Sequence, residues 1–346
     1  MSDPTADLPH ALGEPAGTGA LKLSPEDFIV EEILGFQPSG AGEHVFLFIE
    51  KRGENTEYVG RQLARFAGIP ARQVSYAGLK DRQGVTRQWF SLQMPGMTEP
   101  DWKAFESDSV RILETGRNAR KLRKGGASGN RFELTLRKLD ASPADLEARL
   151  ATIREQGVPN YFGPQRFGHE GRNLEHARAL FADPGRRIDP HRRGLYLSAA
   201  RSEIFNRILA ARVQAGHWNR AIPGDVFMFG DSHSFFKPDS IDADITQRVQ
   251  NRAIHPSGVL WGTTPSTATD EALAIETEAV RPLAELTAGL EQMGLETARR
   301  PFRLCPEELA WTFPAGDVLR LRFTLPSGAY ATTVLRELVR GEGVDV

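Results

Sequence analysis

The sequence has a single cysteine, Cys305, among its 346 residues. One thiol cannot form a disulfide within the chain, and it excludes zinc or iron–sulfur sites that are built from four cysteines. No apolar run approaches the 18 residues of a membrane-spanning helix, and the densest run, Val45–Ile49, is short. The first residues lack the basic stretch and apolar block of a signal peptide. We therefore expect a reduced, soluble, cytoplasmic protein.

Net charge is also nearly absent, because 43 Lys and Arg residues against 45 Asp and Glu residues leave −2 at pH 7. This balance excludes a histone-like protein that binds nucleic acid through bulk charge, but it permits a local basic cleft. His169-Glu170 and His176 do not have the spacing of the HExxH zinc motif. The sequence also lacks a phosphate-binding P-loop, a dinucleotide fingerprint and a GxSxG nucleophile elbow. We expect chemistry without a metal or a nucleotide cofactor.

The chain length fits about two domains. Residues 1–20 are rich in Pro, Gly and Ala, and we expect them to form a loosely held, flexible arm. Strand patterns dominate the chain up to residue 139 and return at Val318–Leu325, whereas helices, glycine-rich loops and short elements fill the middle. We therefore expect one sheet-centred domain, formed by residues 21–156 and 305–346, that is interrupted by an inserted mixed domain at residues 157–304.

Apolar periodicity and end signals predict the main elements of the chain. Expected helices follow the caps Asn55 and Ser142, and others are expected at Asn173–Ala182, Leu195–Ala215 and Ala331–Arg340. β-branched and aromatic residues predict strands in the first part of the chain. The expected strands are Phe28–Leu34, His44–Lys51, Val74–Ala77, Thr86–Leu92, Val110–Leu113 and Phe132–Leu139.

The loop Gly78–Gly84, between two expected strands, is the most informative stretch. Asp81 lies between Lys80 and Arg82, and nearby cations favour the ionised form of a carboxyl group. An ionised carboxylate suits a nucleophile or a base rather than a general acid. The two glycines permit tight backbone geometry and the close approach of a bulky substrate. The same composition also fits an ordinary polar turn, so the residues alone leave both interpretations open.

Cations are concentrated between Arg111 and Lys138, where nine basic residues accompany two acidic ones. The stretch contains a glycine-rich loop, Gly125–Asn130, whose backbone amides suit phosphate oxygens, and Phe132 follows it. Contact with an RNA backbone together with base stacking requires this combination, although a solvated surface loop explains the composition equally well. We expect four of these residues to contact the RNA backbone, and we call them the basic segment: Arg120, Lys121, Arg123 and Lys124.

A third stretch, Asn160–Gly168, combines three aromatic residues, an amide pair and an arginine between glycines. This loop is too aromatic for a plain linker. It suits either the stacking and hydrogen bonding of a base or the attachment of one domain to the other.

Five segments together resemble the TruD family of tRNA pseudouridine synthases, and they follow the family order. The resemblance implies an α+β fold, in which a pseudouridine-synthase catalytic domain on a mixed, mainly antiparallel sheet is interrupted by an inserted α/β TRUD domain. It implies that uridine-13 of tRNA is converted to pseudouridine in the cleft between them. It implies no cofactor, metal, membrane or obligatory protein partner. The segments are Lys22–Glu32, Gly78–Thr86, Gly129–Phe132, Val158–Gly168 and Leu325–Thr332.

The resemblance also assigns roles to single residues. Asp81 is the implied catalytic carboxylate, and Lys22 is the residue that would pair with it and support catalysis. Phe28, Asn130 and Tyr330 fall at substrate-contacting positions, and Phe132 falls where a ring stacks on the extruded uracil. Many members have Phe at the position of Tyr330, so the additional hydroxyl needs a hydrogen-bond partner or water here.

Alternatives remain at this stage. Asp81 can attack C1′, attack C6 of the base or remove the C2′ proton. A non-catalytic RNA-binding protein or chaperone would use the same cleft without chemistry. A glycosidase or nucleoside hydrolase would need a second carboxylate, for which Glu31 and Glu32 are the nearest candidates.

Overall fold

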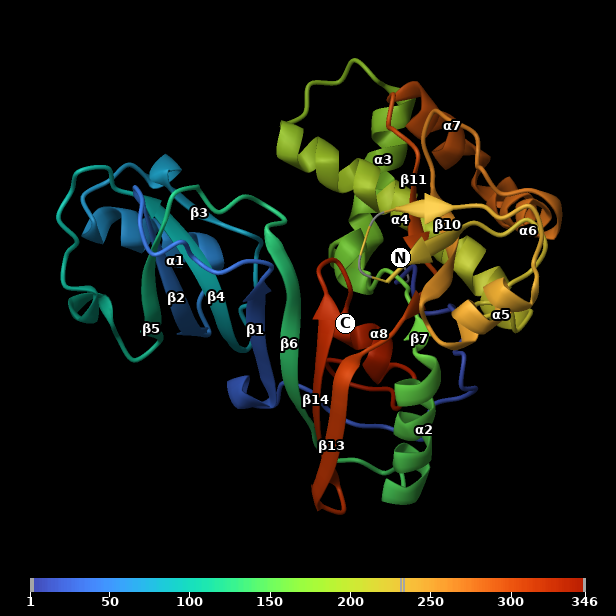
Figure 1. Ribbon diagram of the computed structural model, residues 1–346, viewed down its shortest axis with the longest axis horizontal. Helices are drawn as coiled ribbons and strands as arrows, with labels where there is room; N and C mark the ends of the chain where they lie inside the picture. Colours follow the sequence, from blue (N-terminus) through green and yellow to red (C-terminus); the bar gives the residue numbers. More distant parts are fainter. Residues whose placement is uncertain (1–2, 231, 233, 345–346) are drawn as a thin grey trace.

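The computed structural model describes residues 3–230, 232 and 234–344, and its largest feature is an eight-stranded sheet (Figure 1). The strands follow the order β13-β14-β6-β1-β4-β2-β5, with β3 paired to β4. Strands β1 and β4 run parallel, and the other neighbours are antiparallel. The bounds are β1 (Phe28–Leu34), β2 (His44–Arg52), β3 (Val74–Tyr76), β4 (Val85–Gln93), β5 (Val110–Asn118), β6 (Ala127–Leu136), β13 (Glu307–Ala315) and β14 (Val318–Pro326).

A second unit lies beside the large sheet, at the upper right of Figure 1. Its four-stranded sheet has the order β11-β10-β8-β9, and helices surround it. The mixed, mainly antiparallel main sheet together with these helices confirms the expected α+β fold. The bounds are α3 (Arg172–Ala182), α4 (Pro190–Gln214), β8 (Phe227–Phe229), β9 (Phe235–Phe236), α5 (Ala243–Gln250), β10 (Ile254–Leu260), α6 (Asp270–Val280), α7 (Ala284–Gln292) and β11 (Ala298–Pro301).

The chain passes between the two units through a short antiparallel ribbon. Strand β7 (Val158–Pro159) leaves the large sheet and pairs with β12 (Arg303–Leu304), on which the chain returns. The large sheet therefore combines strands from residues 28–136 with strands from residues 307–326, and the second unit uses the residues between them. The domain bounds at residues 157 and 304 stay a prediction.

Helices pack against both ends of the large sheet, and each end has its own hydrophobic core. At one end, α1 (Thr56–Phe66) packs Val59 and Leu63 against β2 and β4. At the other end, α2 (Pro143–Gln156) and α8 (Ala331–Leu335) pack against β6, β14 and β1. Helices α1 and α2 begin at the expected caps. Asn55 accepts a hydrogen bond from the amide of Glu57 at 2.9 Å, and Ser142 accepts one from the amide of Asp145 at 3.1 Å.

Several expected bounds differ from the structure, most of all in four elements. Strand β5 continues to Asn118 instead of ending at Leu113. Helix α4 begins at Pro190, because Asp189 caps it, rather than at Leu195. Helix α8 ends at Leu335 instead of Arg340, and three of its five residues are β-branched, which lowers helix propensity. Strand β6 begins at Ala127, so most of the expected glycine loop is strand.

The N-terminal residues are not the loosely held, flexible arm that their composition predicts. Leu8 is only 3% exposed and belongs to the core of the second unit. Arg336, just after α8, donates hydrogen bonds to the carbonyl oxygens of Leu8 at 2.6 Å and Pro9 at 3.2 Å. The amide of Ala16 donates to the carbonyl of Leu338 at 2.9 Å. Proline and glycine prevent regular elements here, but they do not prevent packing, so the expectation is wrong for residues 3–20.

Candidate active site

Asp81 lies on the loop between β3 and β4, and a buried polar network holds the base of this loop. Thr56 at the start of α1 accepts a hydrogen bond from the amide of Lys80 at 3.1 Å and donates to Gln88 at 2.8 Å. The side-chain amide of Gln88 donates to the carbonyl of Gly78 at 3.2 Å. This buried network restricts the conformation of the loop at its base.

The Asp81 carboxylate is held in its ionised form. Its Oδ2 atom forms an ion pair with Nζ of Lys22, and its Oδ1 atom accepts a hydrogen bond from the amide of Gln83 at 2.9 Å. Burial by itself would raise the pKa of this carboxyl group. The hydrogen bond and charge of Lys22, the amide of Gln83 and the charge of Lys51 outweigh that effect, and the pKa is lowered below its ordinary value.

The cations that act on Asp81 are not its sequence neighbours, as the composition of the loop suggested. Lys80 turns away and pairs with Glu32 at 2.6 Å, while Arg82 donates to the carbonyl of Gly53 at 3.2 Å. Lys22 and Lys51 reach Asp81 from elsewhere in the chain. Lys22 has a left-handed backbone with φ of +63°, which is uncommon for a residue with a β-carbon and is concentrated at functional sites.

An aromatic series extends from this ion pair into the sheet. The Lys22 ammonium lies 4.2 Å from the centre of the Phe28 ring, and the Phe28 ring meets Phe132 edge-on at 6.3 Å. Phe132 stacks on Phe323 of β14 at 5.5 Å. Both Phe28 and Phe132 are 7% exposed and belong to the core that β1, β6 and β14 share. The structure thus brings Asp81, Lys22, Phe28 and Phe132 together.

Asn130 lies two residues before Phe132 on β6, opposite Glu32 of β1 and Leu325 of β14. Its side-chain oxygen is buried, yet it accepts no hydrogen bond from any residue in the described part of the chain. A buried polar atom without a partner is costly, and the Asn130 oxygen therefore retains its capacity to accept a hydrogen bond.

Tyr330 lies immediately before α8, and its contacts lead to the second unit. Nε of Arg166 donates a hydrogen bond to the Tyr330 hydroxyl at 3.0 Å, and the same guanidinium donates to Ser198 of α4 at 2.9 Å. The Phe162 ring meets Tyr330 edge-on at 6.3 Å. The extra hydroxyl therefore has its partner. Phe162 and Phe167 are buried in the core of the second unit, and the contacts of Phe162 and Arg166 with Tyr330 connect this loop to the chain before α8.

The basic segment lies between β5 and β6 with all four of its side chains exposed. The amide of Gly125, directly after it, donates a hydrogen bond to the carbonyl of Ala77 at 2.8 Å, and Ala77 begins the Asp81 loop. The amide of Gly126 donates to the main-chain carbonyl of Arg123 at 3.0 Å. These glycine amides are therefore used within the protein and are not free for phosphate. The charged side chains are exposed, and Lys121 also donates a long hydrogen bond to the carbonyl of Arg72 at 3.4 Å.

The structure does not favour a second catalytic carboxylate. Glu31 pairs with Arg131 at 2.9 Å and Arg87 at 3.3 Å. Glu32 is buried, pairs with Lys80 and accepts a hydrogen bond from the amide of Trp89 at 3.1 Å. Both carboxylates therefore serve structural contacts. No group of three or more His, Cys, Asp or Glu residues in the described ranges is placed to hold a metal ion. No described helix is long and apolar enough to cross a membrane.

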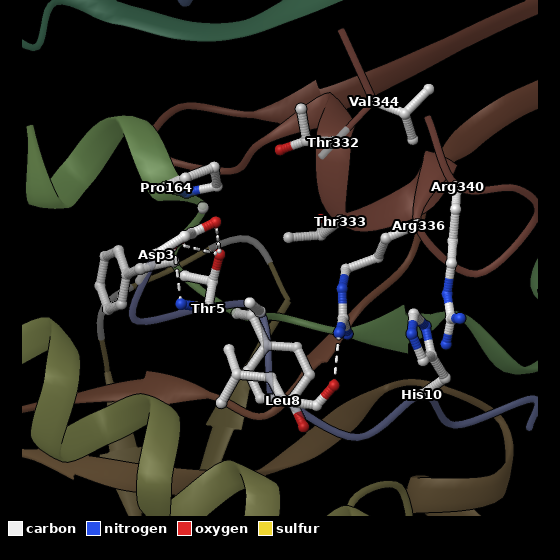
Figure 2. Close-up of a pocket in the computed structure, with 14 residues that line it drawn as sticks. Asp3, Thr5, Leu8, His10, Pro164, Thr332, Thr333, Arg336, Arg340 and Val344 are labelled. Carbon is white, nitrogen blue, oxygen red and sulfur yellow. Dashed lines mark hydrogen bonds between the residues drawn. The ribbon is translucent and has the colours of Figure 1, made fainter. Parts of the chain in front are cut away.

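A cavity of about 370 Å³ is separate from the Asp81 loop, although Phe162, which contacts Tyr330, forms part of its wall (Figure 2). It is bounded by the N-terminal segment, the loop at residues 161–164 and the chain around and after α8. Its arginines are already engaged, Arg336 with the carbonyls of Leu8 and Pro9 and Arg340 with Glu14. The cavity contains none of the candidate site residues.

The sequence patterns missed Lys51, and they indicated Arg166 only as the arginine of the aromatic loop, without its partner Tyr330. Lys51 is fully buried on β2 and donates a hydrogen bond to the carbonyl of Asp81 at 3.1 Å. The sequence did contain a sign of this role, because Lys51 continues the inward-facing series Val45, Leu47 and Ile49 at a position where an apolar residue is expected. The role of Arg166 has no comparable local signal, because it depends on Tyr330, which lies 164 positions later.

Comparison with known proteins relates this geometry to a family. A family model described as tRNA pseudouridine synthase D (TruD) matches residues 10–181 and 172–338. The tRNA pseudouridine synthase D of Methylococcus capsulatus is 54% identical over 96% of this chain and 94% of its own length. That of Azotobacter vinelandii is 50% identical over 98% of this chain and 96% of its own length.

A solved structure has the same fold. The crystal structure described as tRNA pseudouridine synthase D from Methanosarcina mazei matches 99% of this chain and 97% of its own, with a TM-score of 0.72 and 23% identity. The loop that carries Asp81, the aromatic series and the aromatic loop at residues 160–168 all lie within the region that the family model matches. The chain therefore belongs to the tRNA pseudouridine synthase D (TruD) family.

Proposed function

We propose that the protein converts uridine-13 of tRNA to pseudouridine, with Asp81 as the catalytic carboxylate and without a cofactor. The reaction breaks the N1–C1′ bond, turns the bound uracil and joins C5 to C1′, while the proton lost from C5 is balanced by one gained at N1. Nothing is oxidised, so a carboxylate in a shaped pocket suffices. The observation that carries the proposal is the ion pair between Asp81 and Lys22 in a chain of this family.

The ionised state of Asp81 suits each mechanism that remains open. Attack at C1′, attack at C6 and removal of the C2′ proton all require a deprotonated carboxylate. Lys22 and Lys51 lower the pKa of Asp81 against the opposing effect of burial, which supports a base or nucleophile at neutral pH and argues against a general acid. Which of the three steps takes place depends on how the uridine lies relative to the Asp81 carboxylate.

Asn130 and the aromatic residues supply the uracil site in this proposal. The N3–H group of uracil is a hydrogen-bond donor, and the unpartnered side-chain oxygen of Asn130 is a matching acceptor. Phe28 and Phe132 provide apolar surface beside Lys22, against which an everted base stacks. Leaving the RNA stack costs a few kcal/mol, which these contacts offset. Because both rings are mostly buried, binding the base requires them to shift.

We assign the two units their family roles on the same basis. Residues 21–156 and 305–346 form the catalytic domain, residues 157–304 form the inserted TRUD domain, and tRNA lies between them. The exposed basic segment contacts the tRNA backbone beside the Asp81 loop, to which Gly125 ties it. Tyr330 contacts the substrate at the junction of the two domains. The activity belongs to the cytoplasm, where the protein meets tRNA.

The Asp81→Asn variant tests the catalytic assignment. We expect it to abolish tritium release from C5-labelled tRNA, because the amide cannot act as a base or nucleophile, while tRNA affinity stays nearly unchanged. Asp108→Asn, at an exposed position, is the matched control and should keep full activity. Near-normal tritium release from Asp81→Asn would contradict the assignment.

The same assay separates the other functions. A wild-type protein that binds tRNA but releases no tritium would be an RNA-binding protein without chemistry. Chromatography of the product distinguishes isomerisation from hydrolysis, because a hydrolase liberates free uracil whereas an isomerase retains the base in the RNA. Mapping the modified position in tRNA from a strain that lacks the protein tests uridine-13.

A further inference from the structure

Lys51 is a fully buried cation directly beneath the Asp81 loop. It lies on β2, opposite Thr86 of β4 and Val110 of β5, and its relative exposure is 0%. In the part of the chain that the structure describes, its ammonium has two hydrogen-bond acceptors, both main-chain carbonyls: that of Glu54 at 2.8 Å and that of Asp81 at 3.1 Å. Lys51 therefore holds the backbone of Asp81, whereas Lys22 contacts its carboxylate.

A lysine at this position is expensive for the fold. Transfer of an ammonium group from water into a protein interior costs several kcal/mol unless nearby charges and acceptors compensate for it. Val45, Leu47 and Ile49 precede Lys51 on the same inward face of β2, so an apolar side chain at position 51 would pack there without the cost of burying a charge. The cation thus serves something other than packing.

The charges around Lys51 show which group it serves. Burial lowers the pKa of the Lys51 ammonium to about 8, with Lys80 acting in the same direction, while the negative charges of Asp81 and Glu54 oppose the shift. Of the two carboxylates, Asp81 has the larger effect. Conversely, the charge of Lys51 contributes to the lowered pKa of Asp81. The two groups therefore favour each other's charged form.

We propose that Lys51 is a positioning residue for Asp81: its buried ammonium fixes the Asp81 carbonyl and supplies a charge that favours the ionised carboxylate. The Lys22 side chain is 14% exposed, so RNA phosphates can compete for it, whereas the fully buried Lys51 is shielded from them. The same ammonium also holds the turn before α1 through Glu54, and Arg82 binds this turn through Gly53. The inference rests on the proposed function of Asp81.

Activity measurements test the role of Lys51 directly. Lys51→Met keeps the length of the side chain and removes its charge, and the exposed Lys103→Met is the matched control. We expect Lys51→Met to lower the single-turnover rate of tritium release at pH 7 by about ten- to a hundredfold, with tRNA affinity unchanged. Circular dichroism establishes that the variant is folded. A folded Lys51→Met variant whose rate stays within about twofold of the wild type would overturn the proposal.

The pH profile distinguishes an electrostatic role from a purely structural one. In the wild type, the rate should fall as the pH rises through the region around 8, because Lys51 loses its proton there and its hydrogen bond to the Asp81 carbonyl weakens. Lys51→Arg retains the charge at higher pH, so its decline should move to more alkaline values. If wild type and Lys51→Arg decline at the same pH, Lys51 is not the titrating group and the proposal fails.

An NMR titration tests the coupling without any substrate. In protein labelled with ¹⁵N-lysine, the Lys51 ammonium should titrate with a pKa of about 8, and its pKa should fall in Asp81→Asn, because the attracting carboxylate is gone. An unchanged Lys51 pKa in that variant would overturn the inference. If the wild type releases no tritium from tRNA, the proposed function fails, and the titration still reports on Lys51 alone.

Discussion

Replacing Tyr330 by Phe, the residue that many family members have there, should destabilise this protein. The hydroxyl of Tyr330 accepts a hydrogen bond from Nε of Arg166, and the other end of that guanidinium binds Ser198 of the second unit. Tyr330→Phe removes the acceptor and leaves a half-buried guanidinium N–H without its partner. The substitution therefore weakens the attachment of α8 to the second unit, although it restores a common residue.

The size of the effect follows from the kind of hydrogen bond. A hydrogen bond to a charged group contributes about 1.5–3 kcal/mol, and we take the lower end because Arg166 and Tyr330 are both partly exposed. A loss of about 1.5 kcal/mol lowers the melting temperature by roughly 3–6 °C for a domain of this size class. The aromatic ring is retained, so the rate of tritium release should change little, while KM for tRNA rises if the two units separate more easily.

Differential scanning calorimetry and steady-state kinetics check this prediction. Tyr58→Phe is the matched control, because the Tyr58 ring is 45% exposed and the change should leave the melting temperature unaltered. Ser198→Ala combined with Tyr330→Phe forms a double-mutant cycle through Arg166, and the two losses should not be additive. A melting temperature of Tyr330→Phe equal to that of the wild type would refute the reasoning.

Three further predictions concern charge and packing. Lys22→Met should move the acid limb of the pH–rate profile to higher pH, because burial then raises the pKa of Asp81 with less opposition, and a profile that stays in place would contradict the ion pair's role. Alanine substitution of all four residues of the basic segment should weaken binding of every tRNA and reduce the slope of log K against log salt by about three, measured by filter binding. An unchanged slope would show that RNA follows another path. Leu8→Ala should lower the free energy of unfolding in urea by about 2–3 kcal/mol, since Leu8 is buried in the second unit's core; a loss near zero would mean that the N-terminal segment detaches in solution.

Local patterns predicted much of the fold. The run Phe28–Leu34 has the bounds of β1, and the caps Asn55 and Ser142 begin α1 and α2 as expected. Each of these features depends on residues a few positions apart, through alternating burial or a hydrogen bond from a side chain to a nearby amide. The expectation for residues 3–20 failed for the same reason. Local composition indicates whether helices or strands form, but it does not indicate whether a segment packs against distant parts of the chain.

The partners of the site residues depend on distant parts of the chain. Asp81 was singled out for the charges beside it in sequence, yet Lys80 and Arg82 bind other groups, and its cations come from Lys22 and Lys51. The parallel pairing of β1 with β4 brings the residues before Phe28 to the Asp81 loop, and the pairing of β2 with β4 places Lys51 beneath it.

The amino-acid order was thus enough to locate a carboxylate on a loop between two strands and to place it in a family. Whether that carboxylate is charged depends on strand order, because Coulomb interactions act through space and weaken with distance rather than with separation along the chain. Folding brings Lys22 across 59 positions and Arg166 to Tyr330 across 164, and it thereby gives the loop its charge and the two units their connection.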